Sequence, residues 1–173
     1  MKKENILVVA AHPDDEVLGC GGTLLKLRKN NNINICFLTD GESARKTKLR
    51  KISARKNSAI QVAKKITNNK PIFLNYSDNQ LDKIPLLKII KKIEKIFENI
   101  KPSVIFTHTS NCLNIDHKIC NEVVNVACRP VKKFKIKKIL GFEILSSTEW
   151  SFNDSKFNPN YFVNITKEFN EKL

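Results

Sequence analysis

Short apolar runs alternate along the chain with longer stretches in which apolar residues recur at helical spacing. This alternation is typical of repeated βα units and predicts an α/β fold with a mostly parallel sheet. We expect strands over residues 6–11, 33–38, 72–75, 104–107, 139–144 and 162–165. We expect helices over residues 23–29, 48–66, 84–99 and 116–127. No internal repeat, low-complexity tract or linker interrupts the pattern, so we expect a single domain over residues 1–173.

The N-terminal segment and the cysteines bear on where the protein works. The apolar run 6–11 is half as long as a signal-peptide core, and no run reaches the ~20 apolar residues of a membrane-spanning helix. An odd number of cysteines without a C-x-x-C pair disfavours a secreted disulfide framework. These cysteines are Cys20, Cys36, Cys112, Cys120 and Cys128. We therefore expect a cytoplasmic protein without a membrane span.

The formal net charge of +14 raises the alternative of a nucleic-acid-binding protein, because clustered basic residues attract phosphates. Only five of the 31 basic residues are Arg, however, and the lysines alternate with Ile and Leu, as in residues 83–101. Such spacing gives the solvated face of a helix and few bidentate phosphate contacts. We expect no specific nucleic-acid partner, and the basic binder remains the less favoured alternative.

The end of the first expected strand carries the run His12-Pro13-Asp14-Asp15-Glu16. Ligands of open α/β sheets bind at the carboxyl ends of the strands. Adjacent carboxylates raise one another's pKa, whereas a divalent cation keeps them ionised, so this run favours a metal site. The alternative is that the carboxylates only stabilise the positive N-terminal end of the following helix.

A second group of polar residues follows the fourth expected strand. These residues are His108, Asn111, Cys112, Asn114, Asp116 and His117. All three histidines of the chain therefore lie at the ends of two expected strands, which can be neighbours in a parallel sheet. His12, Asp15 and His117 would then offer zinc two nitrogens and one oxygen and leave a fourth position for water. A lone histidine is more often a core or surface residue than a metal ligand. For these two histidines together with Asp15, we favour the metal site.

Motifs along nearly the whole chain recur in the order found in one known family. They are His12-Pro13-Asp14-Asp15-Glu16 with the glycines behind it, Thr39-Asp40-Gly41-Glu42, Arg55, residues 74–81 with Asp78, Asn114-Ile115-Asp116-His117, Ser147-Thr148-Glu149-Trp150 and residues 157–163. In these motifs the chain resembles the LmbE/PIG-L family of zinc-dependent N-acetylglucosaminyl deacetylases. The resemblance implies a Rossmann-like three-layer α/β sandwich with the active site at the carboxyl ends of the strands.

The resemblance also implies an activity, namely metal-dependent removal of the N-acetyl group from an N-acetylglucosamine-type sugar or conjugate. His12, Asp15 and His117 match the ligands of one Zn²⁺ per chain, although Fe(II) and Co(II) accept the same donors. Asp14 matches the general base, with zinc-activated water attacking the acetamide. The expected partner is a small N-acetylated sugar conjugate, and a homo-oligomer is compatible with the sequence.

The resemblance gives supporting roles to four further residues. Asn114 is expected to donate to the oxyanion, and Asp116 to orient a ligand histidine. Arg55 and Asp78 match positions that hold sugar hydroxyls, and an ordinary ion pair is the alternative for each.

Three features depart from the family pattern. Cys112 stands where the family commonly has Asp, Ser58 stands where it commonly has Glu, and the chain ends at Leu173, sooner than most members. Because a thiolate is a good zinc ligand, Cys112 could replace Asp15 in the ligand set. The departures keep open a catalytically silent metal-binding protein of the same fold.

Two local expectations complete the sequence-based picture. The glycine cluster is expected to form a tight turn beside the metal loop rather than a phosphate cradle; it comprises Gly19, Gly21 and Gly22. Trp150, the only Trp, is expected in the core in preference to the pocket wall.

Overall fold

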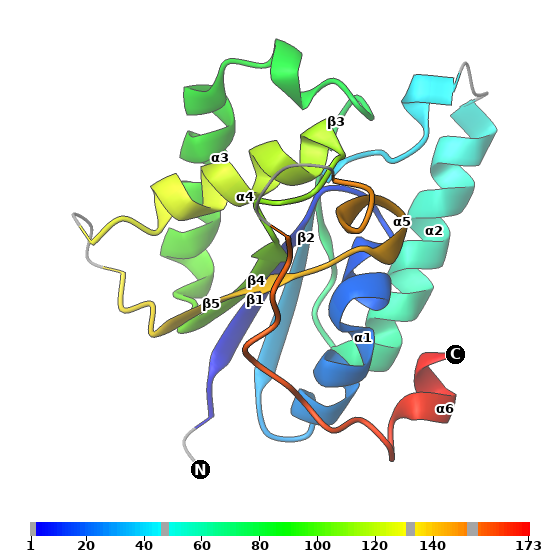
Figure 1. Cartoon of the computed structure of the whole chain (residues 1–173), viewed down its shortest axis with the longest axis vertical. Coiled ribbons are helices and arrows are strands. Elements are labelled where there is room, and N and C mark those ends of the chain that lie inside the picture. Colours follow the sequence, from blue (N-terminus) through cyan, green and yellow to red (C-terminus); the bar gives the residue numbers. More distant parts are fainter. Residues whose placement is uncertain (1–2, 46–48, 131–133, 152–155) are drawn as a thin grey trace.

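The computed structural model describes residues 3–45, 49–130, 134–151 and 156–173. Within these ranges, five strands form one parallel sheet in the order β3-β2-β1-β4-β5 (Figure 1). The strands are β1 (Asn5–Ala10), β2 (Asn32–Thr39), β3 (Ile72–Tyr76), β4 (Val104–His108) and β5 (Lys138–Phe142). The expected α/β fold with a parallel sheet is confirmed.

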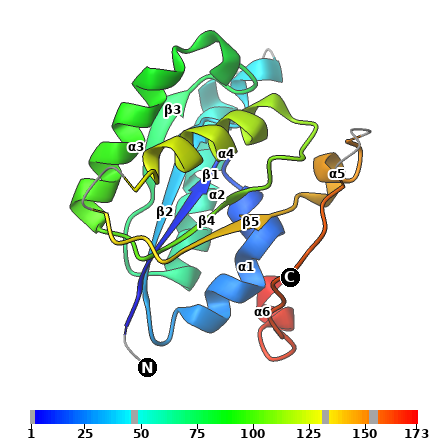
Figure 2. The same cartoon turned by 60° about the vertical axis from the view of Figure 1, so that its left-hand side comes forward.

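Helices cover both faces of the sheet and so give three layers (Figures 1 and 2). The longer ones are α1 (Asp15–Leu27), α2 (Leu49–Ile66), α3 (Leu86–Ile100) and α4 (Ile115–Ala127). The short ones are α5 (Leu145–Thr148), α6 (Phe169–Lys172) and the 3₁₀ turns η1 (Ser43–Arg45) and η2 (Leu81–Lys83). Among the described residues, no helix combines the length and apolar character that a bilayer crossing requires.

The alternation of side chains along β1 builds the two cores. Leu7 and Val9 pack into the cluster that contains residues of α3 and α4, whereas Ile6 and Val8 pack into the cluster that contains residues of α1 and α2. Successive residues of a strand point to opposite faces, and a strand buried on both faces reads as a continuous apolar run. This explains the uninterrupted apolar segment at the start of the sequence.

The glycine cluster lies inside α1, so the expected tight turn is wrong, and the helix starts at Asp15 instead of residue 23. A Cβ added at Gly19 would lie 2.2 Å from the Phe142 ring, and one at Gly22 would lie 2.4 Å from Ile165 Cδ1. Two of the glycines therefore permit close packing of α1 against β5 and the C-terminal segment. Glycine within a helix lowers the stability of that helix relative to alanine.

The expected strand over residues 162–165 is absent from the sheet, which ends at β5. Phe162 is 78% exposed, and Asn164 O accepts a hydrogen bond from Lys26 Nζ of α1 at 2.7 Å. Packing on α1 has thus overridden the β propensity of this segment. Trp150 is 57% exposed, so the expected core position is also wrong.

The pairing of β1 with β4 places two distant loops side by side. Ile6 is paired with Val104, and Val8 is paired with Phe106. Because the strands are parallel and in this register, the segments that follow Ala10 and His108 leave the sheet at the same edge. The two polar groups singled out in the sequence meet there.

Candidate active site

Three buried side chains from these loops converge on one point. His12 Nδ1 lies 3.1 Å from Asp15 Oδ2 and 3.1 Å from His117 Nε2, and the latter two atoms are 3.4 Å apart. Tetrahedral zinc with bonds of ~2.1 Å needs ligand atoms ~3.4 Å apart. These residues, called the ligand triangle below, therefore have the donor types and spacing that fit a divalent cation.

Local backbone geometry creates the first half of the triangle. The chain turns sharply after β1, with Asp14 at φ 156° and ψ −22°, values unusual for a residue other than Gly. Asp15 begins α1, and its Oδ2 accepts the main-chain N–H of His12 at 2.7 Å. Asp15 and Glu16 thus also occupy the first turn of a helix, as the dipole alternative predicts. The two explanations are compatible.

The second half of the triangle depends on the N-cap of α4. Asn114 Oδ1 accepts the main-chain N–H groups of Asp116 at 2.8 Å and His117 at 3.3 Å. This cap fixes the first turn of α4 and therefore the position of His117. The amide nitrogen of Asn114 donates to Asn79 Oδ1 at 3.3 Å, so both ends of the Asn114 side chain have partners.

Two carboxylates lie on the other edge of the His12 ring. His12 Nε2 is 3.1 Å from Asp78 Oδ1 and 3.2 Å from Asp116 Oδ2. This second group could itself hold a cation. However, Asp116 already accepts the main-chain N–H groups of Asn79 at 2.7 Å and Leu81 at 3.1 Å. These bonds favour a role in which the carboxylates accept from Nε2–H and leave Nδ1 facing the triangle.

The protonation of the triangle reflects its crowding. Burial alone would lower the pKa of His12, but hydrogen bonds to Asp116, Asp15 and Asp78 raise it to about 11. Burial would also lower the pKa of His117, but its hydrogen bonds to Asp15 and Cys112 raise this pKa to about 9. The pKa of Asp15 would rise on burial, but its hydrogen bonds to the surrounding histidines hold it well below its usual value. Protonation of the histidines thus offsets the negative charge of Asp15, as a bound cation would, so protons and a cation compete for these groups.

Asp14 points out of the triangle toward α2. Its side chain is 45% exposed, and its Oδ2 accepts from Arg55 Nη2 at 2.5 Å. Burial and the charge of Asp15 raise the pKa of Asp14, and the Arg55 guanidinium counteracts this rise. The neighbourhood therefore combines a carboxylate of raised pKa with a cation that fixes its direction.

Arg55 reaches Asp14 because Gly41 leaves room for it. Gly41 has φ 68°, and a Cβ there would lie 2.9 Å from Arg55 Nε. Arg55 Nη1 also donates to Glu42 Oε1 at 3.0 Å. Arg55 and Asp78, both expected to hold sugar hydroxyls, already have charged partners within the protein: Arg55 is bonded to Asp14 and Glu42, and Asp78 contacts His12.

His108 belongs to the site, although we expected no specific role for it from the sequence. Its Nε2 accepts the N–H of Ala11 at 3.0 Å and lies 3.3 Å from Asp15 Oδ2. Its ring stacks on that of His117, with centroids 3.9 Å apart and planes at 17°. Burial lowers the pKa of His108 to about 4, so the ring is neutral. The sequence feature that could have indicated a role for His108 is its position directly after the apolar run 104–107, at the end of an expected strand.

Cys112 lies outside the ligand triangle. Its Sγ is 3.1 Å from His117 Nδ1, on the edge of the ring opposite the nitrogen that faces His12. The alternative in which Cys112 replaces Asp15 as a ligand is therefore disfavoured. Ser58, the other departure within the chain, is exposed on α2.

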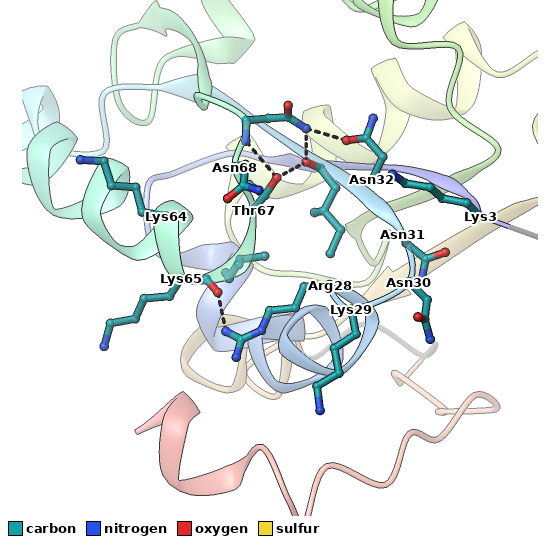
Figure 3. A pocket seen from close by; sticks show the side chains of 13 residues that line it. Lys3, Arg28, Lys29, Asn30, Asn31, Asn32, Lys64, Lys65, Thr67 and Asn68 are labelled. Carbon is teal, nitrogen blue, oxygen red and sulfur yellow. Dashed lines mark hydrogen bonds between the residues drawn. The ribbon is translucent and has the colours of Figure 1, made fainter.

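A pocket lies at the opposite, amino-terminal edge of the sheet (Figure 3). It measures about 490 Å³, and its rim carries Lys3, Arg28, Lys29, Lys64 and Lys65. The amide of Asn69 is engaged with the protein itself, since its Nδ2 donates to Asn32 Oδ1 and Ile33 O at 2.8 Å each. Figure 3 shows the side chains of Lys29, Lys64 and Lys65 extending away from one another. This pocket therefore lacks the convergence seen at the triangle.

Comparison with known proteins places the chain in a family. The family model described as PIG-L, GlcNAc-PI de-N-acetylase, matches residues 7–128, well over half of the chain. The chain belongs to the PIG-L family. The matched range includes both loops of the ligand triangle, and deacetylases are prominent among the relatives of this PIG-L chain.

Two relatives are similar to this PIG-L protein in sequence. The uncharacterized deacetylase YaiS of Escherichia coli (strain K12) is 29% identical over 174 residues, which cover 97% of this chain and 85% of the relative. The probable N-acetyl-alpha-D-glucosaminyl L-malate deacetylase 2 of Bacillus subtilis (strain 168) is 29% identical over 141 residues, which cover 76% of this chain. The match spans 63% of the length of the Bacillus relative.

Solved structures share the PIG-L fold at lower identity. The N,N'-diacetylchitobiose deacetylase of Pyrococcus horikoshii has a TM-score of 0.77 at 22% identity, covering 96% of this chain and 66% of that one. GalB, the 4-carboxy-2-hydroxymuconate hydratase of Pseudomonas putida KT2440, has a TM-score of 0.72 at 20% identity. The match covers 99% of this chain and 76% of the GalB chain. Because one neighbour is a deacetylase and the other a hydratase, the fold alone does not decide the reaction.

Proposed function

We propose that this PIG-L protein is a metal-dependent hydrolase that removes the N-acetyl group from an N-acetylglucosamine-type sugar or conjugate. The observation that carries the proposal is the ligand triangle with Asp14 directly beside it, at the carboxyl edge of the sheet. Membership of a deacetylase family and the named activities of the relatives support the choice of reaction.

The ligand triangle would hold the cation through His12 Nδ1, an oxygen of Asp15 and His117 Nε2. Zn²⁺ suits this set of two imidazoles and one carboxylate, and Fe(II) and Co(II) accept it as well. When bound, the cation supplies Lewis acidity, which lowers the pKa of water and polarises the acetamide carbonyl.

Asp14 would move the protons of the reaction. Arg55 holds Oδ2, which leaves Oδ1 to take a proton from the attacking water and to return it to the nitrogen of the departing amine. The raised pKa of Asp14 suits a group that must both accept and release a proton. One proton of the water passes through Asp14 to the amine nitrogen and the second leaves the new carboxyl group, so the products are acetate and the ammonium form of the amino sugar, and atoms and charge balance.

The remaining residues would position these groups. Asp116 and Asp78 orient His12 through its Nε2–H, in keeping with their distances of 3.2 and 3.1 Å. Arg55 orients Asp14, a contact that favours a positioning role over direct binding of sugar hydroxyls. Asn114 remains the proposed oxyanion donor, although its amide nitrogen must first leave Asn79.

The test is a panel of N-acetylglucosamine conjugates incubated with metal-loaded protein, with detection of free amine. Release by the wild type, and its loss in Asp14→Asn, are the expected results. Metal bound at one ion per chain without release from any conjugate would support the silent metal-binding protein instead. Ser58→Glu and Cys112→Asp, which restore the family residues, then show whether the departures are responsible.

A further inference from the structure

A hydrogen-bonded group behind His117 connects the ligand triangle to α5. Cys112 Sγ is fully buried and lies 3.1 Å from His117 Nδ1 and 3.0 Å from Ser147 Oγ. The hydroxyl of Thr148 lies 3.6 Å from the same sulfur. One sulfur atom therefore contacts a candidate metal ligand and two hydroxyls of α5, and one of these hydroxyls, that of Ser147, also lies 3.5 Å from His117 Nδ1.

The ring of His117 separates this sulfur from the triangle. The two nitrogens of an imidazole point in different directions, and His117 Nε2 is the one 3.1 Å from His12 Nδ1. A sulfur at hydrogen-bonding distance from Nδ1 lies behind the ring and cannot bind an ion held by Nε2. Cys112 can act on such an ion only through His117.

The protons of the group can be assigned without a charged sulfur. His117 Nδ1–H donates to Cys112 Sγ, the thiol donates to Ser147 Oγ, and the Ser147 hydroxyl donates to Ile144 O at 3.5 Å. Thr148 Oγ1, which accepts the N–H of Ile144 at 2.9 Å, is within reach of the sulfur as a second donor. Placing the ring proton on Nδ1 leaves the lone pair of Nε2 for the triangle.

We propose that Cys112, supported by Ser147, is a positioning residue that fixes the tautomer and ring orientation of His117. The proposal rests on the proposed function, because it requires Nε2 to bind a cation. In metal sites this role usually falls to a carboxylate or a backbone carbonyl, and a thiol is a weaker acceptor. Cys112 is one of the departures noted in the sequence, and the thiol, supported by α5, here contacts the histidine in the way that a carboxylate often does in metal sites.

Metal affinity measured without substrate tests the proposal. Cys112→Ala should weaken Co(II) and Zn(II) binding by about 10- to 100-fold, the usual effect of losing such a partner. Cys112→Ser, which keeps an acceptor, should restore much of the affinity. Cys120→Ala is the matched control, since Cys120 is also fully buried, on α4, and its sulfur contacts Val9 O and Thr107 instead of His117. It should leave metal affinity unchanged.

The absorption spectrum of the Co(II) protein separates positioning from ligation. A wild-type spectrum without a thiolate-to-cobalt charge-transfer band supports the proposal, whereas a band that disappears in Cys112→Ala makes Cys112 a ligand and overturns it. Equal metal affinities of Cys112→Ala and Cys120→Ala, or a wild type that binds no Co(II), also overturn it. If the affinities change as expected but no conjugate is deacetylated, the positioning role stands and the proposed function fails.

Discussion

The two edges of the sheet differ in how their polar groups are arranged. At the carboxyl edge, His12, Asp15 and His117 place three ligand atoms within 3.4 Å of one another in a buried position. At the amino edge, five basic residues surround a pocket of about 490 Å³, but their side chains do not meet (Figure 3). Convergence of donor atoms therefore identifies the site better than volume or charge.

The basic residues at the amino edge have a structural explanation. α1 and α2 both end there, at Leu27 and Ile66, and the C-terminal ends of helices carry partial negative charge. Arg28 donates to Lys65 O at 2.5 Å and pairs with Glu171 at 2.6 Å. Arg28 at this edge thus neutralises a helix end, whereas the side chains at the carboxyl edge converge on one another.

The largest effect should follow from removing a ligand at the carboxyl edge. Asp15→Ala takes away one of three donors, so bound metal should fall from one ion per chain to near zero and activity to that of the metal-free protein. Elemental analysis after dialysis measures the first quantity, and circular dichroism checks the fold. Full metal content in this variant would show that the ion binds elsewhere.

Asp14→Asn should separate binding from catalysis. The neutral amide cannot accept a proton, so kcat should fall by about 10²- to 10⁴-fold. Metal content should remain at the wild-type value, because Asp14 lies outside the triangle. Unchanged kcat, or loss of the metal, would assign Asp14 a different role.

His108 provides a test of the packing behind the triangle. His108→Phe keeps a ring against His117 but removes the acceptor of the Ala11 N–H, so metal affinity should fall by about 10- to 100-fold. His108→Gln retains an acceptor and should lose less. Binding titrations that rank the variants in the opposite order would make ring stacking the decisive contact.

Metal affinity should rise with pH. In the metal-free protein, the pKa values of His12 and His117 are raised, to about 11 and about 9. Their nitrogens are 3.1 Å apart, so a proton between them must leave before a cation binds. Proton competition therefore weakens binding at low pH, and it diminishes as the pH rises through about 9, where His117 loses its proton, and on toward about 11, where His12 does. Calorimetry in buffers of different ionisation enthalpy should detect proton release, and a pH-independent affinity would contradict this assignment.

The smallest effect on activity is expected at the amino edge. The double substitution Lys64→Ser/Lys65→Ser should leave deacetylation unchanged, because these residues lie at the opposite edge from the triangle. Non-specific nucleic-acid binding should weaken, and the slope of log affinity against log salt should fall by about one for each lysine that no longer neutralises a phosphate. A large loss of activity in this variant would show that the two edges are coupled.

The sequence predicted β1 to β4 and the starts of α2, α3 and α4 closely, but it missed the start of α1 and added a strand over residues 162–165. Strands β1 to β4 match apolar runs that are bounded by polar loops, a short-range signal. The start of α1 was missed because Pro13 and three carboxylates resemble a loop, although Pro and acidic residues also favour the first turn of a helix. The roles of Gly19 and Gly22 depend on Phe142 and Ile165, which local pattern cannot reveal.

In the candidate site too, some residues could be predicted from the sequence and others depend on tertiary packing. His12, Asp15 and His117 could be chosen because parallel strands deliver their ends to one edge. The contacts of Arg55 with Asp14, of Asp78 with His12 and of Cys112 with Ser147 join residues far apart in the chain. They follow from how α2, η2 and α5 pack, so no spacing in the sequence encodes them.

A crystal structure of the zinc-loaded protein, with anomalous data at the zinc edge, tests the central claim most directly. We expect one strong peak within bonding distance, ~2.1 Å, of His12 Nδ1, an Asp15 oxygen and His117 Nε2. A peak bonded to Cys112 Sγ, a peak between Asp78 and Asp116, or no peak at the carboxyl edge would contradict the account.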